Sequence, residues 1–195
     1  MRRARSLPPP AVAAADAVPA DAVPADDRAE QTLEALFRRH HAGVYRLALR
    51  YAGGDAGFAE DVTQDVFLIL HEHLGELHTH DSLTGWLYRV TSNCCLQRLR
   101  RRRLIDRMRG LIPGLGGGPS ADPEHALATR RELRRVWSTV ESLDPRERMV
   151  LCMHHLDGKR QAEIAEILGL SRGYVCKLLQ RAQARVREKG WILDD

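Results

Sequence analysis

Residues 161–180, QAEIAEILGLSRGYVCKLLQ, carry the pattern that most restricts how this chain can fold. The apolar residues fall on one face of each of two helices: Ile164, Ala165 and Leu168 on the first, and Val175, Leu178, Leu179, Ala182 and Val186 on the second. Between them, Gly169 can adopt the positive φ of a tight turn, and Ser171 is a natural N-cap. The spacing therefore predicts two helices that cross closely.

The opposite face of the second predicted helix is basic and polar. It carries Arg172, Tyr174, Lys177, Gln180, Arg181 and Arg185. Arginine and lysine bind guanine edges and phosphates, and glutamine pairs with adenine, so this face suits a recognition helix in the DNA major groove. A helical hairpin with a solvated basic face is the alternative. The turn glycine, the cap and the apolar spacing together favour duplex DNA binding.

The composition favours helices along the whole chain. Ala, Leu, Arg and Glu dominate and β-branched runs are nearly absent, which predicts an all-α fold. Residues 1–30 are rich in Pro, Ala and Asp and have few large apolar side chains, so we expect a disordered tail there. Pro and Gly in residues 104–123 predict a flexible linker, with room for one helical turn at its start. Two small helical domains follow, residues 31–103 and 124–191.

The apolar periodicity predicts three helices in the first of these domains. They cover about residues 31–51, about residues 57–74, and a segment from Asp81 or Ser82 into a series of arginines. In the second domain a helix is expected at about residues 123–142. Asp144 and Pro145 then signal the start of another, and Glu147 can close a capping box.

Charge is concentrated in two segments. The net charge of the whole chain is +4, but residues 98–109 hold seven arginines and one acid, and residues 159–189 hold eight Lys or Arg and three Glu. Two separate basic segments favour two contacts with a polyanion, most simply nucleic acid.

Two further helix faces carry polar patterns. Asp61, Gln64, Asp65 and Leu68 share one face of the second predicted helix, which favours docking of a basic partner helix over a merely solvated face. The third predicted helix interleaves Trp86, Tyr88, Arg89 and Asn93 with apolar residues. Aromatic and basic side chains in this order suit stacking on unpaired bases, although a tryptophan alone is more often part of a core.

Catalytic and metal-binding patterns are missing. We find no paired catalytic carboxylates, nucleophile triad or phosphate loop, and the nine histidines show no zinc-finger or HExxH spacing. We therefore expect no enzyme activity, cofactor or metal. The four cysteines form no C-x-x-C pair, and neither a membrane-spanning run nor an export signal occurs. A cytoplasmic protein with reduced thiols is expected.

Four segments in order resemble sigma-70 family factors of the extracytoplasmic-function (ECF) type. They are AEDVTQDVFL, then WLYRVTSN with its arginine tail, then LDPRERMVLCMHHLDG, then EIAEILGLSRGYVCKLLQRAQARVRE. The resemblance covers about residues 33–103 and 124–188. It departs from the family pattern at Gln97, where an acidic residue is common, and at Cys94 and Cys95, which replace aliphatic residues or alanine.

The resemblance implies a function and a set of contact residues. Such factors bind core RNA polymerase, direct it to promoters and help to open the DNA. The β′ coiled coil of the polymerase would contact Asp61, Gln64, Asp65, Phe67 and Leu68. The melted −10 element would contact the loop at residues 78–82 and Trp86, Arg89, Asn93, Arg98, Arg100, Arg101, Arg102 and Arg103. The −35 element would contact Arg172, Tyr174, Lys177, Gln180, Arg181 and Arg185.

The resemblance also implies partners beyond DNA and the coiled coil. The second domain would touch the β flap of the polymerase, and the linker would occupy its RNA exit path. Many relatives have an anti-sigma factor. The resemblance therefore adds an anti-sigma factor to the candidate partners of this chain. A helix-turn-helix regulator that acts without docking on the polymerase is the alternative function.

Overall fold

The computed structural model describes residues 32–74, 80–110 and 128–190, which form helices joined by short turns. In chain order these are α2 (Leu33–Ala52), α3 (Ala56–His73), α4 (His80–Gly110), α5 (Ala128–Ser142), α6 (Pro145–His155), α7 (Gln161–Leu168) and α8 (Arg172–Glu188). No strand occurs in these three ranges, and the predicted all-α fold is confirmed. The tail predicted at residues 1–30, residues 78–79 of the loop predicted at 78–82 and the linker beyond residue 110 lie outside the described residues. Residues 80–82 of that loop are helical instead, because α4 begins at His80.

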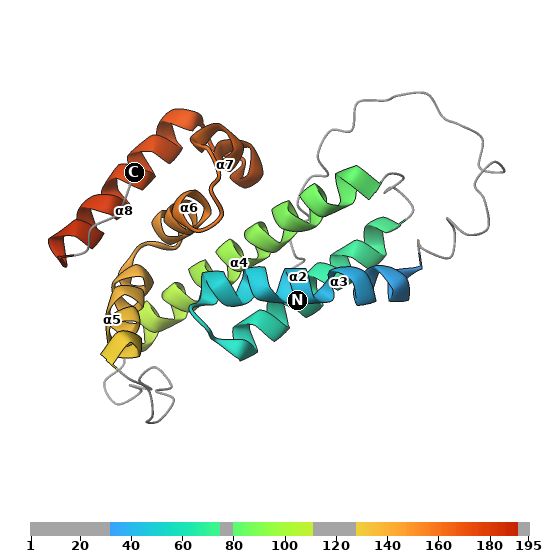
Figure 1. Ribbon diagram of the computed structural model, residues 1–195, viewed down its shortest axis with the longest axis horizontal. Coiled ribbons are helices and arrows are strands. Elements are labelled where there is room, and N and C mark those ends of the chain that lie inside the picture. The colour runs from blue at the N-terminus through green and yellow to red at the C-terminus, as the bar shows by residue number, and fades with distance from the viewer. Residues whose placement is uncertain (1–31, 75–79, 111–127, 191–195) are drawn as a thin grey trace.

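Helices α2 and α3 form a hairpin that packs on α4 (Figure 1). Thr32 caps α2 by accepting a hydrogen bond from the backbone N–H of Ala35. Gly53 ends α2 in the left-handed conformation, at φ 74°, as the Gly53-Gly54-Asp55 sequence predicts. Asp55 then caps α3, because its carboxylate accepts the N–H of Phe58 at 2.8 Å.

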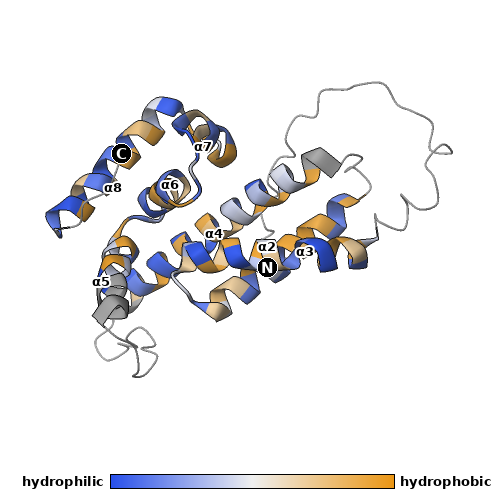
Figure 2. Cartoon of the chain, viewed as in Figure 1, coloured by the Kyte–Doolittle hydropathy of each residue, from blue (hydrophilic) through white to orange (hydrophobic). Residues whose placement is uncertain are grey.

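The apolar stripes of these helices form the core of the first block, by which we mean α2, α3 and α4. Figure 2 shows hydrophobic and hydrophilic residues alternating along α2 and α3. The most deeply buried side chains include Ala48, Tyr51, Phe58, Val62, Val66, Leu70 and Cys95. Burying large apolar and aromatic side chains is the main contribution to the stability of this block.

The second block consists of α5, α6, α7 and α8. The predicted capping box is present at the start of α6: the Asp144 carboxylate accepts the Arg146 N–H at 3.0 Å, and Glu147 accepts the Asp144 N–H at 3.3 Å. Gly158 adopts a φ of 64° in the turn between α6 and α7. The predicted start of α6 is therefore confirmed.

The predicted helix-turn-helix consists of α7 and α8. Gly169 ends α7 at φ 63°, and the Ser171 hydroxyl accepts the Tyr174 N–H at 3.2 Å at the start of α8. All eight apolar residues assigned to the two inner faces are buried: Ile164, Ala165, Leu168, Val175, Leu178, Leu179, Ala182 and Val186. The predicted crossing of the two helices is therefore confirmed.

Helix α4 belongs to both blocks. It packs on α2 and α3 along one side and contacts α6 and α7 along another (Figure 1). It also continues to Gly110, past the predicted domain boundary at residue 103 and beyond the single helical turn expected there. The good helix propensity of its Leu and Arg residues explains the extension, since no glycine occurs between Gly85 and Gly110. The two blocks are thus in direct contact along α4.

The four cysteines are free thiols with different environments. Burial raises the pKa of Cys152 to about 12 and that of Cys94 to about 11, and it also raises the pKa of Cys95 above its ordinary value. A protonated, buried thiol is a poor nucleophile, so these cysteines serve as small core residues. Within the described ranges, no helix is long and apolar enough to span a bilayer.

The turn of the helix-turn-helix gives a direct test of the fold. Gly169→Ala places a Cβ on a residue with φ 63°, so we expect a loss of about 1 kcal/mol in the free energy of unfolding. Gly173→Ala is the matched control, because Gly173 is helical and has open space around its Cα. Urea denaturation followed by circular dichroism should show the control neutral or stabilised. Equal destabilisation of both variants would contradict the assigned turn.

Candidate nucleic-acid and protein interfaces

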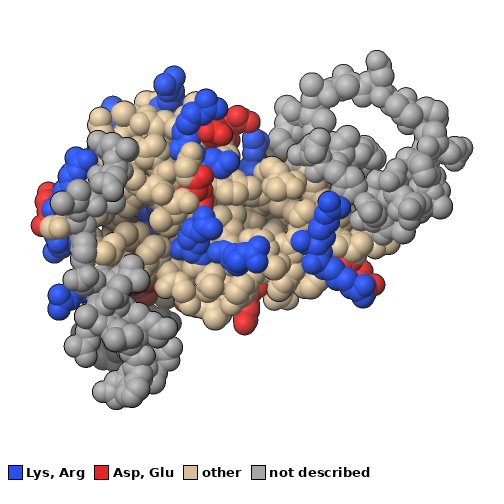
Figure 3. All heavy atoms as spheres, viewed as in Figure 1, with Lys and Arg blue, Asp and Glu red and all other residues tan. Residues whose placement is uncertain are grey.

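The predicted recognition face of α8 is largely open to solvent. Arg172, Lys177, Gln180, Arg181 and Arg185 are all exposed. Figure 3 shows that Lys and Arg side chains on the viewed face gather in separate groups rather than in one continuous patch. The exposure of these five residues makes the α8 face a basic surface open to solvent, as a helix that enters the major groove requires.

Two residues of this face also have contacts inside the second block. Tyr174 is half-buried, its hydroxyl accepts a hydrogen bond from Arg146 at 3.2 Å, and the Arg146 guanidinium lies 5.7 Å from the centre of its ring. Arg185 donates at 2.8 Å to Glu147, whose side chain is only 5% exposed. Glu147 also closes the capping box of α6. Tyr174 and Arg185 thus have structural contacts that the sequence reading did not anticipate.

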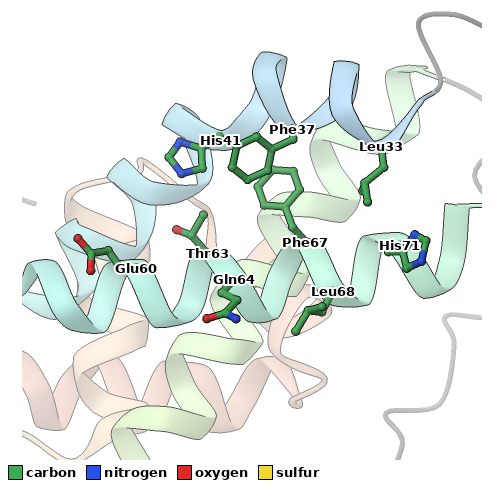
Figure 4. A pocket seen from close by; sticks show the side chains of 9 residues that line it. All are labelled: Leu33, Phe37, His41, Glu60, Thr63, Gln64, Phe67, Leu68 and His71. Carbon is green, nitrogen blue, oxygen red and sulfur yellow. The ribbon is translucent and has the colours of Figure 1, made fainter.

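The face of α3 predicted to dock a partner borders a hollow of about 410 Å³ between α2 and α3 (Figure 4). Its lining comprises Leu33, Phe37, His41, Glu60, Thr63, Gln64, Phe67, Leu68 and His71. The rings of Phe37 and Phe67 approach to 4.7 Å between centroids. Phe67 is buried, whereas Leu68 is 56% exposed and Phe37 is 42% exposed. The hollow therefore presents an apolar surface with polar ends, which suits an amphipathic helix.

The two carboxylates predicted for the same docking face are already paired. Arg98 of α4 donates to Asp61 at 2.7 Å and to Asp65 at 2.8 Å. All three side chains are partly exposed, so the pairs contribute little net stability. They do lower the free negative charge of the α3 face, because one arginine neutralises part of both carboxylates. Arg98 was predicted to contact DNA, and in this structure it joins α4 to α3.

Other arginines of the α4 series are also paired. Arg102 donates to Asp55 at 2.7 Å and lies 4.8 Å from the Phe58 ring. Partial burial opposes ionisation of Asp55, but the Phe58 N–H and the Arg102 guanidinium outweigh it and hold its pKa below the usual range. Arg100 and Arg101 remain exposed. Partial burial and the nearby Arg146 guanidinium of the second block lower the pKa of Arg100.

The polar residues in the middle of α4 face the second block. Arg89 donates to Glu166 of α7 at 2.8 Å. The Asn93 side chain donates to the backbone oxygen of Arg89 at 3.0 Å and to that of Ile167 at 3.2 Å. Trp86 is half-buried against the core, and its ring lies 6.2 Å from that of His73. Trp86, Arg89 and Asn93 are thus divided between the core and the contact with α7.

The sequence reading missed one residue of this region entirely. Asp157, in the turn before α7, accepts hydrogen bonds from Arg50, Tyr51 and Tyr88 of the first block. No local pattern could have singled it out, because its partners lie far away along the chain. Among the described residues, no group of three or more His, Cys, Asp or Glu side chains is placed to hold a metal ion.

Two family models match the chain. The model for sigma-70 region 2 matches residues 36–105, and that for sigma-70 region 4 matches residues 140–188. The first therefore covers most of α2, α3 and α4, and the second covers α6, α7 and α8. The two matches agree with the two blocks seen in the structure.

Curated relatives agree with these models. The chain is 32% identical to the ECF RNA polymerase sigma factor SigM of Mycobacterium tuberculosis, over 78% of this chain and 74% of SigM. It is 30% identical to the ECF RNA polymerase sigma factor SigE of Mycolicibacterium smegmatis, over 84% of this chain and 63% of SigE. The match to the probable RNA polymerase sigma factor RfaY of Xanthomonas campestris is 30% identical and spans 34% of that protein. The chain thus spans less than two thirds of SigE and RfaY.

Two solved structures have a similar fold. CnrH, solved in complex with the cytosolic domain of CnrY, superposes with a TM-score of 0.51 at 27% identity, over 84% of this chain and 88% of that chain. The sigma factor RpoE from Bartonella quintana, solved with the anti-sigma factor NepR, gives a TM-score of 0.54 at 16% identity, over 84% and 96%. The second likeness concerns the fold alone.

The contacts of α8 separate residues that stabilise the fold from residues that are free to bind. Arg185→Ala leaves the buried Glu147 carboxylate without its charged partner, so we expect a loss of about 1 kcal/mol in the free energy of unfolding. Lys177→Ala removes a side chain that is exposed on the same face and should change stability by less than about 0.5 kcal/mol. Urea denaturation of both variants measures the difference. An Arg185→Ala variant as stable as Lys177→Ala would show that the ion pair contributes nothing.

Proposed function

This chain belongs to the ECF group of the sigma-70 family of RNA polymerase sigma factors, and on that premise we propose how it works. It binds core RNA polymerase in the cytoplasm, directs the enzyme to specific promoters and helps to open the DNA. It supplies binding energy and performs no covalent chemistry. The separate basic face of α8 is the observation that carries the proposal, because it leaves a reading surface for duplex DNA on one block while the other offers a protein-docking surface.

The second block reads the −35 element through α8. Arg172, Lys177, Gln180 and Arg181 are exposed on one helix face, and among the described residues none of these four side chains has a hydrogen bond or an ion pair. Lys and Arg contacts to phosphates give affinity, whereas Arg and Gln contacts to base edges give sequence preference. Arg185 contributes less in this proposal, since its guanidinium is shared with Glu147.

The α3 face docks the β′ coiled coil of the polymerase. Leu68 and Phe37 are large apolar side chains left exposed beside the hollow of Figure 4, and such exposed apolar surfaces commonly mark protein interfaces. Gln64 at its rim offers hydrogen bonds. Asp61 and Asp65 contribute to the charge of this surface to the extent that Arg98 leaves them unneutralised.

The exposed arginines of α4, together with Trp86, Arg89 and Asn93, hold the unpaired −10 strand. Basic side chains follow the phosphate backbone, and an aromatic ring stacks on a base. An anti-sigma factor is also among the proposed partners. CnrH and the Bartonella quintana RpoE were both solved with another protein bound, RpoE with an anti-sigma factor.

Transcription in vitro tests the proposal. The purified chain and core polymerase are given a library of genomic promoter fragments, and sequencing of the RNA 5′ ends should reveal start sites with a shared upstream motif. Lys177→Ala combined with Arg181→Ala should lower initiation by about tenfold or more, because each base or phosphate contact contributes on the order of 1 kcal/mol. Arg38→Ala with Arg46→Ala on α2 is the charge-matched control. Duplex DNA binding without any initiation would instead favour the alternative, a regulator that does not dock on the polymerase.

The docking surface gives a separate prediction. Leu68→Arg puts a charge at the edge of the apolar hollow and should weaken binding to core polymerase by about tenfold or more, since an unpaired charge in an interface is costly. Leu104→Arg is the matched control, because Leu104 is equally exposed at 59% and lies away from the hollow. Both variants should melt like the original chain. Unchanged core affinity of Leu68→Arg, measured by biolayer interferometry, would overturn the assignment.

A further inference from the structure

The carboxylate of Asp157 joins the two blocks. Tyr88 donates to its Oδ2 at 2.7 Å, Tyr51 donates to the same oxygen, and Arg50 donates to Oδ1. The Tyr51 and Tyr88 hydroxyls are also within 2.9 Å of each other. The Asp157 side chain is only 5% exposed, so these hydrogen bonds replace the water that the carboxylate would otherwise bind.

Every hydrogen bond described for this carboxylate leads to the first block. Asp157 belongs to the turn between α6 and α7, whereas Arg50 and Tyr51 lie in α2 and Tyr88 lies in α4. Its side chain therefore holds the second block against the first rather than stabilising its own turn. Lys159 adds to the same contact, with its ammonium 5.1 Å from the centre of the Tyr88 ring.

The contact covers polar residues of α4 that the proposed function assigns to DNA. Arg89 is paired with Glu166, and Asn93 donates to the backbone of Ile167, so α7 occupies the surface that an unpaired strand would need. In Figure 1, α6 and α7 lie beside α4, in agreement with their contacts. A DNA strand and α7 cannot both use Arg89 and Asn93.

We propose that Asp157 is the latch of a closed, self-inhibited form of the free chain, in which α7 covers the strand-binding side of α4. The latch must open before Arg89 and Asn93 can bind DNA. The part of this inference that concerns DNA rests on the proposed function, whereas closure itself depends only on the contacts between the blocks.

The closed form also contains energetically unfavourable buried groups, which favour opening. Within the described residues, the buried Nε of Arg148 and the buried Nε1 of Trp137 have no hydrogen-bond partner. Both residues lie at the boundary: Arg148 donates to the backbone oxygen of Tyr51, and the Trp137 indole packs directly on Gly53. Buried donors without partners oppose the folded contact. Closure is therefore held by the latch against this opposing cost, which suits a reversible switch.

Hydroxyl-radical footprinting with mass spectrometry measures the closure of the whole chain without DNA or polymerase. In the original chain Tyr51 should be protected, since it is fully buried. Asp157→Asn removes the charge that Arg50 and the two tyrosines bind, so oxidation of Tyr51 and Tyr88 should rise several-fold. Phe58, which is buried inside the first block, should stay protected and thus report that the block is still folded.

A second variant keeps the test independent of Asp157 itself. Arg50→Glu places two carboxylates against each other and should expose the same tyrosines, whereas Arg46→Glu, one turn earlier on an exposed part of α2, should leave them protected. Glu34→Gln is the charge-matched control for Asp157→Asn, because Glu34 pairs only with Arg38 on the surface of α2 among the contacts described. Continued protection of Tyr51 in both Asp157→Asn and Arg50→Glu would overturn the latch.

Binding of a fluorescent single-stranded DNA of mixed sequence tests the consequence. A closed form that outnumbers the open form by about ten to one lowers the apparent affinity about tenfold, so Asp157→Asn should bind about tenfold more tightly than Glu34→Gln. Oxidation that rises without any gain in DNA affinity would overturn the claim that closure hides a strand-binding surface. A chain that shows the expected oxidation and DNA affinities but never initiates transcription with core polymerase would refute the proposed function and leave the latch standing.

Discussion

Two tyrosines and an arginine of the first block surround one carboxylate of the second, and the relative position of the blocks depends on this contact. A carboxylate that loses its water is stable only where donors replace that water, so Asp157 has few positions available to it. Tyr51 and Tyr88 come from α2 and α4, whose spacing is set by the hydrophobic core. Because α7 begins directly after this turn, the same contact directs α7 onto α4.

Helix α4 shows how one sequence pattern can serve two purposes. Its arginine series resembles a continuous surface for nucleic acid, yet Arg98, Arg102 and Arg103 are each bound within the protein, to α3, to Asp55 and to the start of α6. Arg100 and Arg101 stay exposed. Arginine suits both roles because its planar group binds a carboxylate, a backbone oxygen or a phosphate with similar geometry. Fewer of these arginines are therefore free to bind DNA than their number in the sequence suggests.

Local features of the fold could be predicted from the sequence because their causes are local. Asp144 with Glu147, and Gly169 with Ser171, each act within a few residues, and the buried stripe of α8 follows from the helical period. The order of the motifs along the chain also revealed the family, because four motifs in the family's order are together highly specific, although each motif alone is only moderately specific. The end of α4 was less predictable. Helix propensity extends it to Gly110, with no glycine between Gly85 and that position, whereas the Pro- and Gly-rich composition beyond suggested an earlier end.

By itself, the sequence determined the helices, their caps and their inner faces, and it indicated a two-block DNA-binding factor. The tertiary structure decided which of the polar residues are free. It paired Arg98 with both acidic residues of α3, shared Arg185 with a buried Glu147, and brought Asp157 to Tyr51 and Tyr88. The physical reason is separation along the chain. Periodicity reports which side of a helix is apolar, but an ion pair or a hydrogen bond between residues far apart exists only once packing has placed both helices.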